Sequence, residues 1–207
     1  MSDPHRITSV EQLREVVGET TPGLELKNTD SLNDFATDFI GKSPFLILST
    51  SDADGRLDAS PKGDEPGFVR VLDERTLLIP DRPGNRLVYG HQNILANPHV
   101  GVIFIIPGTT ETLRINGRAS LTNDPELLDS LASRGKPAIL ALRVEIEECY
   151  FHCAKAFLRS KLWKPDSWLP KQKISFGEMY VRRTPGAKPE IASQIDERIE
   201  ADYRDNL

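Results

Sequence analysis

Short apolar segments separated by turn-forming residues fill positions 44–121, and this pattern limits the fold more than any other part of the chain. Residues 45–48 read Phe-Leu-Ile-Leu between Pro44 and a Ser-Asp-Ala-Asp-Gly stretch, which predicts a buried strand. Because Asp54-Gly55 is a favoured hairpin turn, residues 56–61 are expected to return as its antiparallel partner. The strands predicted in this region are 45–48, 56–61, 68–72, 76–80, 99–106 and 111–121. The pattern favours a mainly β fold.

Helices are expected around these strands. One covers residues 85–96 and ends before Asn97-Pro98, because proline disfavours the helical conformation in the residue before it. Ile191, Ile195 and Ile199 recur every four residues and predict a terminal amphipathic helix. The other predicted elements are helices over 9–17, 30–41, 123–132 and 153–159, a long strand over 138–151 and a late strand over 175–181.

These elements are expected to form a single structural domain in three parts. Residues 1–42 contribute N-terminal helices that pack on the sheet, residues 43–183 form the ligand-binding domain, and residues 184–207 carry the terminal helix. A chain of 207 residues with 38% hydrophobic and 28% charged residues has the composition of a globular protein with a real core.

Composition also excludes several classes of function. The net charge of −5 argues against nucleic acid as the main partner. No apolar run approaches the roughly 18 residues of a membrane span, so no membrane association is expected. Cys149 and Cys153 lie too close in sequence for a disulfide framework, and the polar start at residues 1–4 shows no secretory signal. Together these features predict a cytoplasmic protein.

Motifs for several common chemistries are missing. The sequence has no G-x-G-x-x-G after a strand and no G-x-x-x-x-G-K-[ST], so glycine-rich phosphate loops are not expected. It also lacks G-x-S-x-G and H-E-x-x-H. Cys149, His152 and Cys153 are possible metal ligands, but they are too few for a typical zinc site, and no metal is expected. No catalytic residue is assigned.

Basic and hydroxyl side chains at two strand ends instead suggest an anion site. Ser60 and Lys62 end one predicted strand, while Asn85 and Arg86 open the helix after another. A phosphate is held by such side chains and by the free amides of a helix N-terminus. If the two strand ends converge, these four residues surround one anion. Residues 155–173 add six basic residues against Asp166, although a solvated basic face balanced by the acidic tail explains that pattern equally well.

Four strings in a fixed order point to a family. SPKG, LLIPDRPGNRL, RINGRA and HCAKAFLRSKLW lie between residues 43 and 168. With this strand order, the chain resembles the FMN-binding split-barrel family that includes pyridoxamine 5'-phosphate oxidase, and within it the uncharacterised oxidase-related branch. The resemblance implies a six-stranded split β-barrel with flanking α-helices. It also implies FMN bound at the interface of a homodimer and a flavin-dependent oxidoreductase that acts on a small-molecule substrate or electron donor.

The same resemblance assigns cofactor-binding positions. Lys62 falls on the family lysine, whereas Leu57 replaces a family arginine and Asn85-Arg86 replaces an Arg-Lys pair. Arg82, Arg114 or Arg118 can supply the missing basic group. Trp163 packs at the interface in the alternative interpretation. The full set of cofactor-binding residues implied by the resemblance is Asp58, Ala59, Ser60, Lys62, Ile79, Pro80, Asp81, Asn85, Arg86 and Arg114, with Lys155, Arg159, Ser160 and Trp163 from the second subunit.

The sequence departs from a true pyridoxamine 5'-phosphate oxidase at the C-terminus. It reads IEADYRDNL where the family enzyme carries a substrate-gripping W-x-x-x-R-L-x-P segment, so a different substrate is expected. Two alternatives stay open. One is a flavin-binding module without turnover, and the other is a protein that binds haem, with His91 or His152 as axial ligand, or another anionic ligand.

Overall fold

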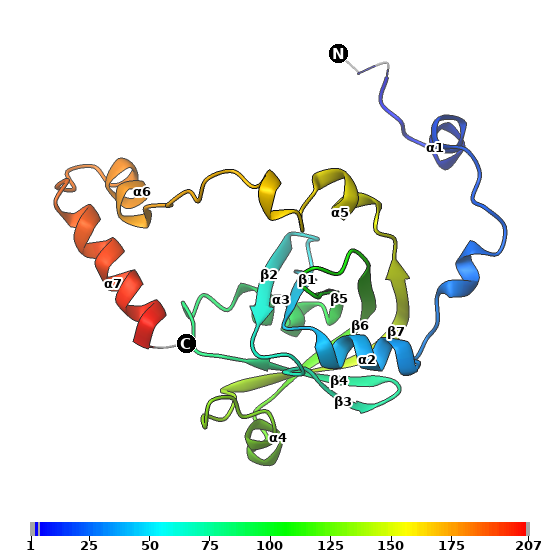
Figure 1. Ribbon diagram of the computed structural model, residues 1–207, viewed down its shortest axis with the longest axis horizontal. Coiled ribbons are helices and arrows are strands. Elements are labelled where there is room, and N and C mark those ends of the chain that lie inside the picture. The colour runs from blue at the N-terminus through cyan, green and yellow to red at the C-terminus, as the bar shows by residue number, and fades with distance from the viewer. Residues whose placement is uncertain (1–2, 4, 206–207) are drawn as a thin grey trace.

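A single curved sheet organises the molecule, whose computed structural model describes residue 3 and residues 5–205 (Figure 1). Three of the four opening residues used above to predict the absence of a secretory signal lie outside the described residues. All strand pairs are antiparallel, and the order across the sheet is β2-β1-β5-β6-β7-β4-β3. The strands are β1 (Phe45–Ser51), β2 (Leu57–Gly63), β3 (Arg70–Asp73), β4 (Thr76–Asp81), β5 (His99–Ile105), β6 (Thr112–Thr122) and β7 (Leu140–His152). The described residues thus form seven strands, against the eight predicted from the sequence pattern and the six of the barrel that the resemblance implies.

Seven α-helices and two 3-10 helices accompany the sheet in the described part of the chain. They are α1 (Val10–Val17), α2 (Asp34–Lys42), α3 (Tyr89–Ala96), α4 (Pro125–Ser130), α5 (Lys155–Ser160), α6 (Phe176–Arg183), α7 (Ile191–Asp205), η1 (Leu24–Lys27) and η2 (Pro165–Ser167). None of the helices in this described part combines the length and the hydropathy needed to cross a membrane.

The larger of two buried clusters contains residues from β1, β4, β5, β6 and β7 and from α2. Alternate residues of β1 and β5 are buried there, among them Leu46, Leu48 and Phe104, as the period of two in a strand requires. Helix α2 adds Phe39 and Ile40 to this core, and its N-cap is Asn33, so it begins four residues later than the predicted helix over 30–41. The apolar alternation that predicts the strands is therefore also what builds the core.

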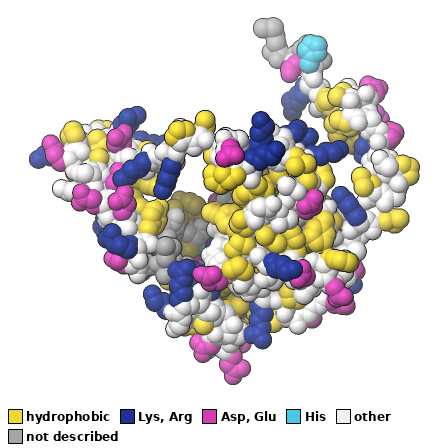
Figure 2. Space-filling view, viewed as in Figure 1, with side chains coloured by type: hydrophobic (Ala, Val, Ile, Leu, Met, Phe, Trp, Pro, Cys, Tyr) yellow, Lys and Arg dark blue, Asp and Glu magenta, His cyan; other side chains and the backbone are white. Residues whose placement is uncertain are grey.

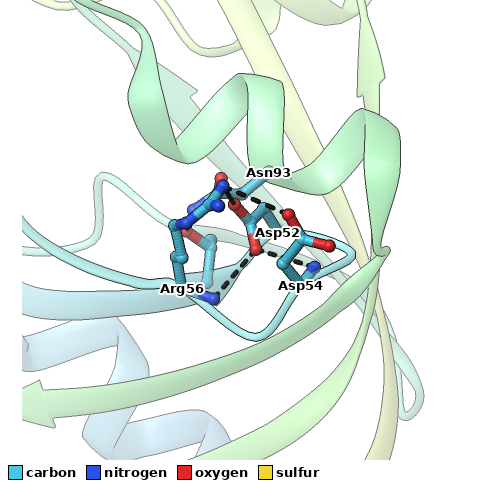
Figure 3. Close-up of polar contacts among 5 residues, drawn as sticks. Asp52, Asp54, Arg56 and Asn93 are labelled. Atoms are coloured by element: carbon cyan, nitrogen blue, oxygen red, sulfur yellow. Dashed lines mark hydrogen bonds and ion pairs between the residues drawn. The ribbon is translucent and has the colours of Figure 1, made fainter.

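The β1–β2 turn is fixed by its own carboxylates. The side chain of Asp52 accepts hydrogen bonds from the backbone amides of Asp54 and Arg56, at 2.9 and 2.8 Å. Figure 3 shows the Arg56 guanidinium beside the carboxylates of Asp52 and Asp54, each 3.2 Å from it. Asn93 reaches toward this turn from α3, and its amide donates to Thr50 Oγ1 at 3.0 Å. The hairpin and α3 are thus tied together.

A helical hairpin follows the sheet at the C-terminal end. Helices α6 and α7 pack on each other beside the sheet (Figure 1). The late strand expected over 175–181 is wrong, because the Ser175 hydroxyl caps a helix there by accepting from the Glu178 amide. A side chain at Gly177 would meet the Ala192 carbonyl oxygen at 2.0 Å, so the two helices approach closely at a glycine.

The N-terminal segment is less embedded. Helix α1 is capped by Ser9, whose hydroxyl accepts from the Gln12 amide at 3.3 Å. None of its residues is buried. The second helix, α2, buries Ala36, Phe39 and Ile40.

Candidate functional site

A cavity of about 280 Å³ lies between β2, the end of β4, the loop 82–88 and the start of α3. Strand β2 reaches it because its even-numbered side chains share one face of the strand. Six of the fourteen predicted cofactor-binding residues line this cavity: Asp58, Ser60, Lys62, Asp81, Asn85 and Arg86. The structure therefore brings together the two strand ends whose convergence the anion-site hypothesis requires.

An ion pair spans the cavity. Lys62 Nζ lies 2.6 Å from Asp81 Oδ1, and the side chains are only 19% and 13% exposed. Lys62 belongs to β2, the first strand of the sheet, and Asp81 to β4, the sixth. The ion pair thus joins two strands that are not neighbours, and the sheet must curve back on itself for them to meet.

His91 lies beside this ion pair, in the first turn of α3. Its Nε2 atom lies 3.7 Å from Asp81 Oδ2, is buried, and has no hydrogen-bond partner among the described residues. Burial lowers the pKa of His91, while the Asp81 carboxylate acts to raise it and the Lys62 ammonium acts to lower it. The imidazole is therefore held in its neutral form around pH 7.

Arg82 lies at the wall of the cavity and is oriented by two contacts. Its Nε donates to Asp64 Oδ2 at 2.8 Å and its Nη2 to the Leu131 carbonyl at 2.8 Å. Its Nη1 is buried without a hydrogen-bond partner in the described part of the chain. Burial acts to raise the pKa of Asp64, but hydrogen bonds from the Glu65 amide, the Ser133 hydroxyl and Arg82 together hold that pKa below its usual value. The Arg82 guanidinium is thus held in place by two acceptors, while its third nitrogen has no partner in the described part of the chain.

The loop 82–88 corrects the helix start expected at residue 85. Helix α3 begins only at Tyr89. The Asn85 side chain accepts from the Leu87 amide at 3.0 Å, a local turn that competes with helix formation. Arg86 and Val88 then adopt left-handed backbone angles, with φ of 61° and 50°. Asn85 and Arg86 consequently reach the cavity from a loop, four and three residues before the helix.

Helix α3 approaches β2 closely at a glycine. A Cβ atom built on Gly90 would lie 3.4 Å from Asp58 Oδ2 and 3.6 Å from Thr50 Oγ1. This spacing lets the first turn of α3, with His91, form one wall of the cavity.

The remaining eight predicted residues do not line this cavity. Ala59 points to the opposite face of β2, and Ile79 and Pro80 are buried within β4. Arg114 lies on β6 with its guanidinium carbon 5.5 Å from the centre of the Tyr150 ring. The other four belong to α5 and the residues after it: Lys155, Arg159, Ser160 and Trp163.

The α5 segment has its own packing. Trp163 Nε1 donates to the Thr109 carbonyl at 2.7 Å, and its ring stacks on Phe157 with 5.8 Å between centroids. The Ser160 hydroxyl donates to the Phe157 carbonyl. Lys155 and Arg159 are exposed, and Figure 2 shows basic side chains gathered over the α5 end of the molecule. This basic surface lies apart from the cavity in a single chain.

The cavity is lined by side chains that can bind an anion. Lys62, Arg82 and Arg86 supply three positive charges, of which Lys62 is paired with Asp81 and Arg82 with Asp64. The Ser60 hydroxyl and the Asn85 amide are further donors at its wall. No group of three or more His, Cys, Asp or Glu side chains suited to a metal ion occurs in the part of the chain that the structure describes. The donor set therefore fits the phosphate of a phosphorylated ligand.

Sequence reasoning did not assign His91 or Tyr89 to this site, although both line the cavity. His91 was considered only as a haem ligand. The usable signal was its position: a residue in the first turn of the helix after a ligand-bearing loop faces the same space as that loop. The signal was obscured because the helix was expected to start four residues earlier.

The chain is similar to one known protein family and to several solved structures. The family model for pyridoxamine 5'-phosphate oxidase matches residues 32–153. No curated protein matches the sequence. Similar solved structures include HupZ of Group A Streptococcus, which is 18% identical, with 57% of this chain and 91% of that chain covered and a TM-score of 0.47. A putative pyridoxamine 5'-phosphate oxidase of Lactobacillus delbrueckii is 23% identical, with 59% and 95% covered and a TM-score of 0.45. An FMN-binding protein of Syntrophomonas wolfei is 10% identical, with 56% and 88% covered and a TM-score of 0.43.

Proposed function

We propose, since the chain belongs to the pyridoxamine 5'-phosphate oxidase family, that its cavity binds FMN and that the protein is an FMN-dependent oxidoreductase. The observation that carries the proposal is the convergence of Ser60 and Lys62 with Asn85 and Arg86 on one cavity. Ser60 and Lys62 come from strand β2 and Asn85 and Arg86 from the loop after β4, and the two segments meet only in the folded sheet. Their donors match what the phosphate of FMN requires.

Each part of the site has a role in this proposal. Lys62 and Arg86 hold the phosphate by charge, and Ser60 and Asn85 orient it by hydrogen bonds. Arg82 supplies the basic group that is missing at Leu57 and Asn85, because it lines the same cavity. Backbone groups of residues 58–60 and 79–81 face the ring edge. The bound flavin supplies hydride and electron transfer, so no protein nucleophile is required.

Membership of the split-barrel family supports a site shared between two copies of the chain. We propose that the sheet is the split barrel of a homodimer, in which the partner completes the site. The basic segment around Lys155, Arg159, Ser160 and Trp163, unused by the cavity of its own chain, then serves the flavin of the other chain. The substrate is proposed to be a small molecule other than pyridoxamine 5'-phosphate.

An absorption spectrum and an FMN titration test this proposal. The expected spectrum of the protein with FMN, after desalting, shows flavin bands near about 370 and 450 nm. Lys62→Ala and Arg86→Ala should each weaken FMN binding by about 1.5–3 kcal/mol, or roughly 10- to 150-fold in Kd, because each removes a charge-assisted hydrogen bond. Lys188→Ala is the matched control, since Lys188 lies in the α6–α7 loop away from the cavity.

The outcomes separate the alternatives. Unchanged affinity in both cavity variants would remove the site assignment. A protein that holds FMN but is not reduced by NADH, NADPH or reduced deazaflavin would be a binding module without turnover. A protein that does not bind FMN but gives a Soret band with added haem would support the haem-binding alternative.

A further inference from the structure

We propose that His91 is a proton-accepting residue of the anion site, which takes one proton from solvent when a phosphate-bearing ligand binds and then pairs with Asp81 in place of Lys62. This inference rests on the proposed function, because it concerns the same cavity. It assigns a role to a half-buried histidine that the anion-site hypothesis does not use.

The geometry that carries this inference is a carboxylate with two possible cationic partners. Asp81 Oδ1 is paired with Lys62 Nζ at 2.6 Å, and Asp81 Oδ2 faces His91 Nε2 at 3.7 Å. The three side chains come from β2, β4 and α3 and are no more than 19% exposed. A movement of less than about 1 Å brings His91 Nε2 into hydrogen-bond distance of Oδ2.

An arriving anion competes with Asp81 for Lys62. If Lys62 turned to the ligand and nothing replaced it, the Asp81 carboxylate would be left buried and unpaired, which is costly. The neighbouring His91 Nε2 is buried without a hydrogen-bond partner in the described part of the chain. A protonated imidazole donates to Asp81 from that atom, so both carboxylate and ligand keep a cation. The balance requires one proton from water and no other reactant.

The other charges around His91 favour the same change. Asp58 and Lys62 face the cavity from β2, Asp81 from β4, Arg82 and Arg86 from the loop, and Tyr89 from the same helix. Burial and Lys62 lower the pKa of His91 in the free protein. A bound phosphate adds negative charge and draws Lys62 away from the imidazole, and both effects raise that pKa.

The consequence is a defined pH dependence. A group whose pKa rises on binding gains a proton in the complex, so the contribution of His91 to ligand affinity is largest below its free-state pKa and is lost as pH rises through its bound-state pKa. Between the two values, the affinity falls by up to about tenfold per pH unit. The phosphate of FMN titrates near pH 6 on its own, so the contribution of His91 has to be measured as a difference.

The experiment measures the pKa of His91 directly by NMR, in the full chain alone, with sodium sulfate and with FMN. Sulfate keeps its charge over this pH range and reports the anion effect without ligand titration. FMN binding is followed separately by quenching of flavin fluorescence, and calorimetry in buffers of different ionisation enthalpy counts the protons taken up. His91→Gln removes the titrating group, and His5→Gln is the matched control, because His5 is exposed in the N-terminal segment.

The expected result is a rise in the pKa of His91 with FMN or sulfate, and a proton uptake that exceeds that of His91→Gln by up to about one per site. The inference is overturned if that pKa stays unchanged with both anions, or if FMN binds the protein and His91→Gln with the same proton uptake. Failure of FMN to bind at any pH is a failure of the proposed function, and the sulfate titration then decides the role of His91 alone.

Discussion

Replacing Gly117 with alanine should destabilise the whole sheet, because strand β7 approaches this glycine more closely than any side chain permits. Gly117 is buried on β6 at the point where the β6–β7 register shifts. A Cβ atom there would lie 2.1 Å from the carbonyl oxygen of Glu145 and 3.2 Å from the Cα of Ile146. Real Cβ atoms stay at least 3.0 Å from such neighbours. Because the obstacle is backbone, no rotamer change relieves it.

The size of the effect follows from the required movement. Separating β6 from β7 by roughly 1 Å takes the flanking ladder hydrogen bonds beyond bonding distance. Losing two such bonds costs about 1 kcal/mol each, and the overpacking strain adds about 1–3 kcal/mol. We therefore expect Gly117→Ala to lower the free energy of unfolding by about 3 kcal/mol or more, and the Tm by about 6 °C or more for a chain of this size.

Urea denaturation followed by circular dichroism measures this loss, and a glycine on the next strand provides the control. A Cβ atom on Gly101 of β5 would meet only side-chain atoms, Asn116 Oδ1 at 3.4 Å and Ser49 Cβ at 3.9 Å. Gly101→Ala is therefore expected to be neutral or stabilising by up to about 1 kcal/mol, because glycine loses more backbone entropy on folding. Equal unfolding midpoints for Gly117→Ala and Gly101→Ala would refute the close-approach argument.

Three further expectations concern other parts of the chain. Asp64→Asn should lower the free energy of unfolding by about 1–3 kcal/mol at pH 7. The difference from the parent protein should shrink below about pH 4, because a carboxyl with a lowered pKa loses its stabilising effect as it is protonated. Urea denaturation at a series of pH values measures this difference, and a difference that stays constant with pH would contradict the expectation. Burial raises the pKa of Cys149 to about 11, so only about one in a thousand of these thiols is ionised at pH 8. A thiol reagent should therefore label only the exposed Cys153 in the native protein, and both cysteines after denaturation. Rapid labelling of both cysteines in the native protein would contradict this expectation. Gly177→Ala should separate α6 from α7 at Ala192 and make this helical hairpin more sensitive to trypsin. The thermal unfolding of the sheet should stay the same. An unchanged rate of trypsin cleavage would show that the close approach at Gly177 is not needed.

Most strands of the sheet are predictable from the alternation of apolar residues and from the residues that form turns. Alternation in strands such as Leu140–His152 and the Asp54-Gly55 turn depend on neighbouring residues, so they are readable from the sequence. The misassigned strand at 175–181 has a local cause as well. Residues 175–181 contain β-branched and aromatic side chains that favour a strand, whereas the Ser175 cap favours a helix. The close contact between Gly177 and Ala192 also favours a helix pair, but it joins residues far apart in the sequence and cannot be recognised from a local pattern.

The candidate site was readable only in part. Alternation along β2 placed Ser60 and Lys62 on one face, and the structure brings them to the same cavity as Asn85 and Arg86. The pairing of Lys62 with Asp81 was not foreseen, because it depends on how far the sheet curves. Neither a hydropathy pattern nor a motif reports that curvature. Whether these residues bind FMN stays a prediction.

The position of the Lys62–Asp81 ion pair makes the cavity a property of the complete sheet. Its two residues belong to the first and the sixth strand of the order β2-β1-β5-β6-β7-β4-β3, so no single hairpin contains the site. A partly folded chain with one strand pair missing between them has no cavity to offer. Any ligand that binds there selects the fully assembled sheet and stabilises it by mass action. Ligand retention by a variant is therefore also a measure of its folding, and a destabilised variant would recover stability as the ligand concentration rises.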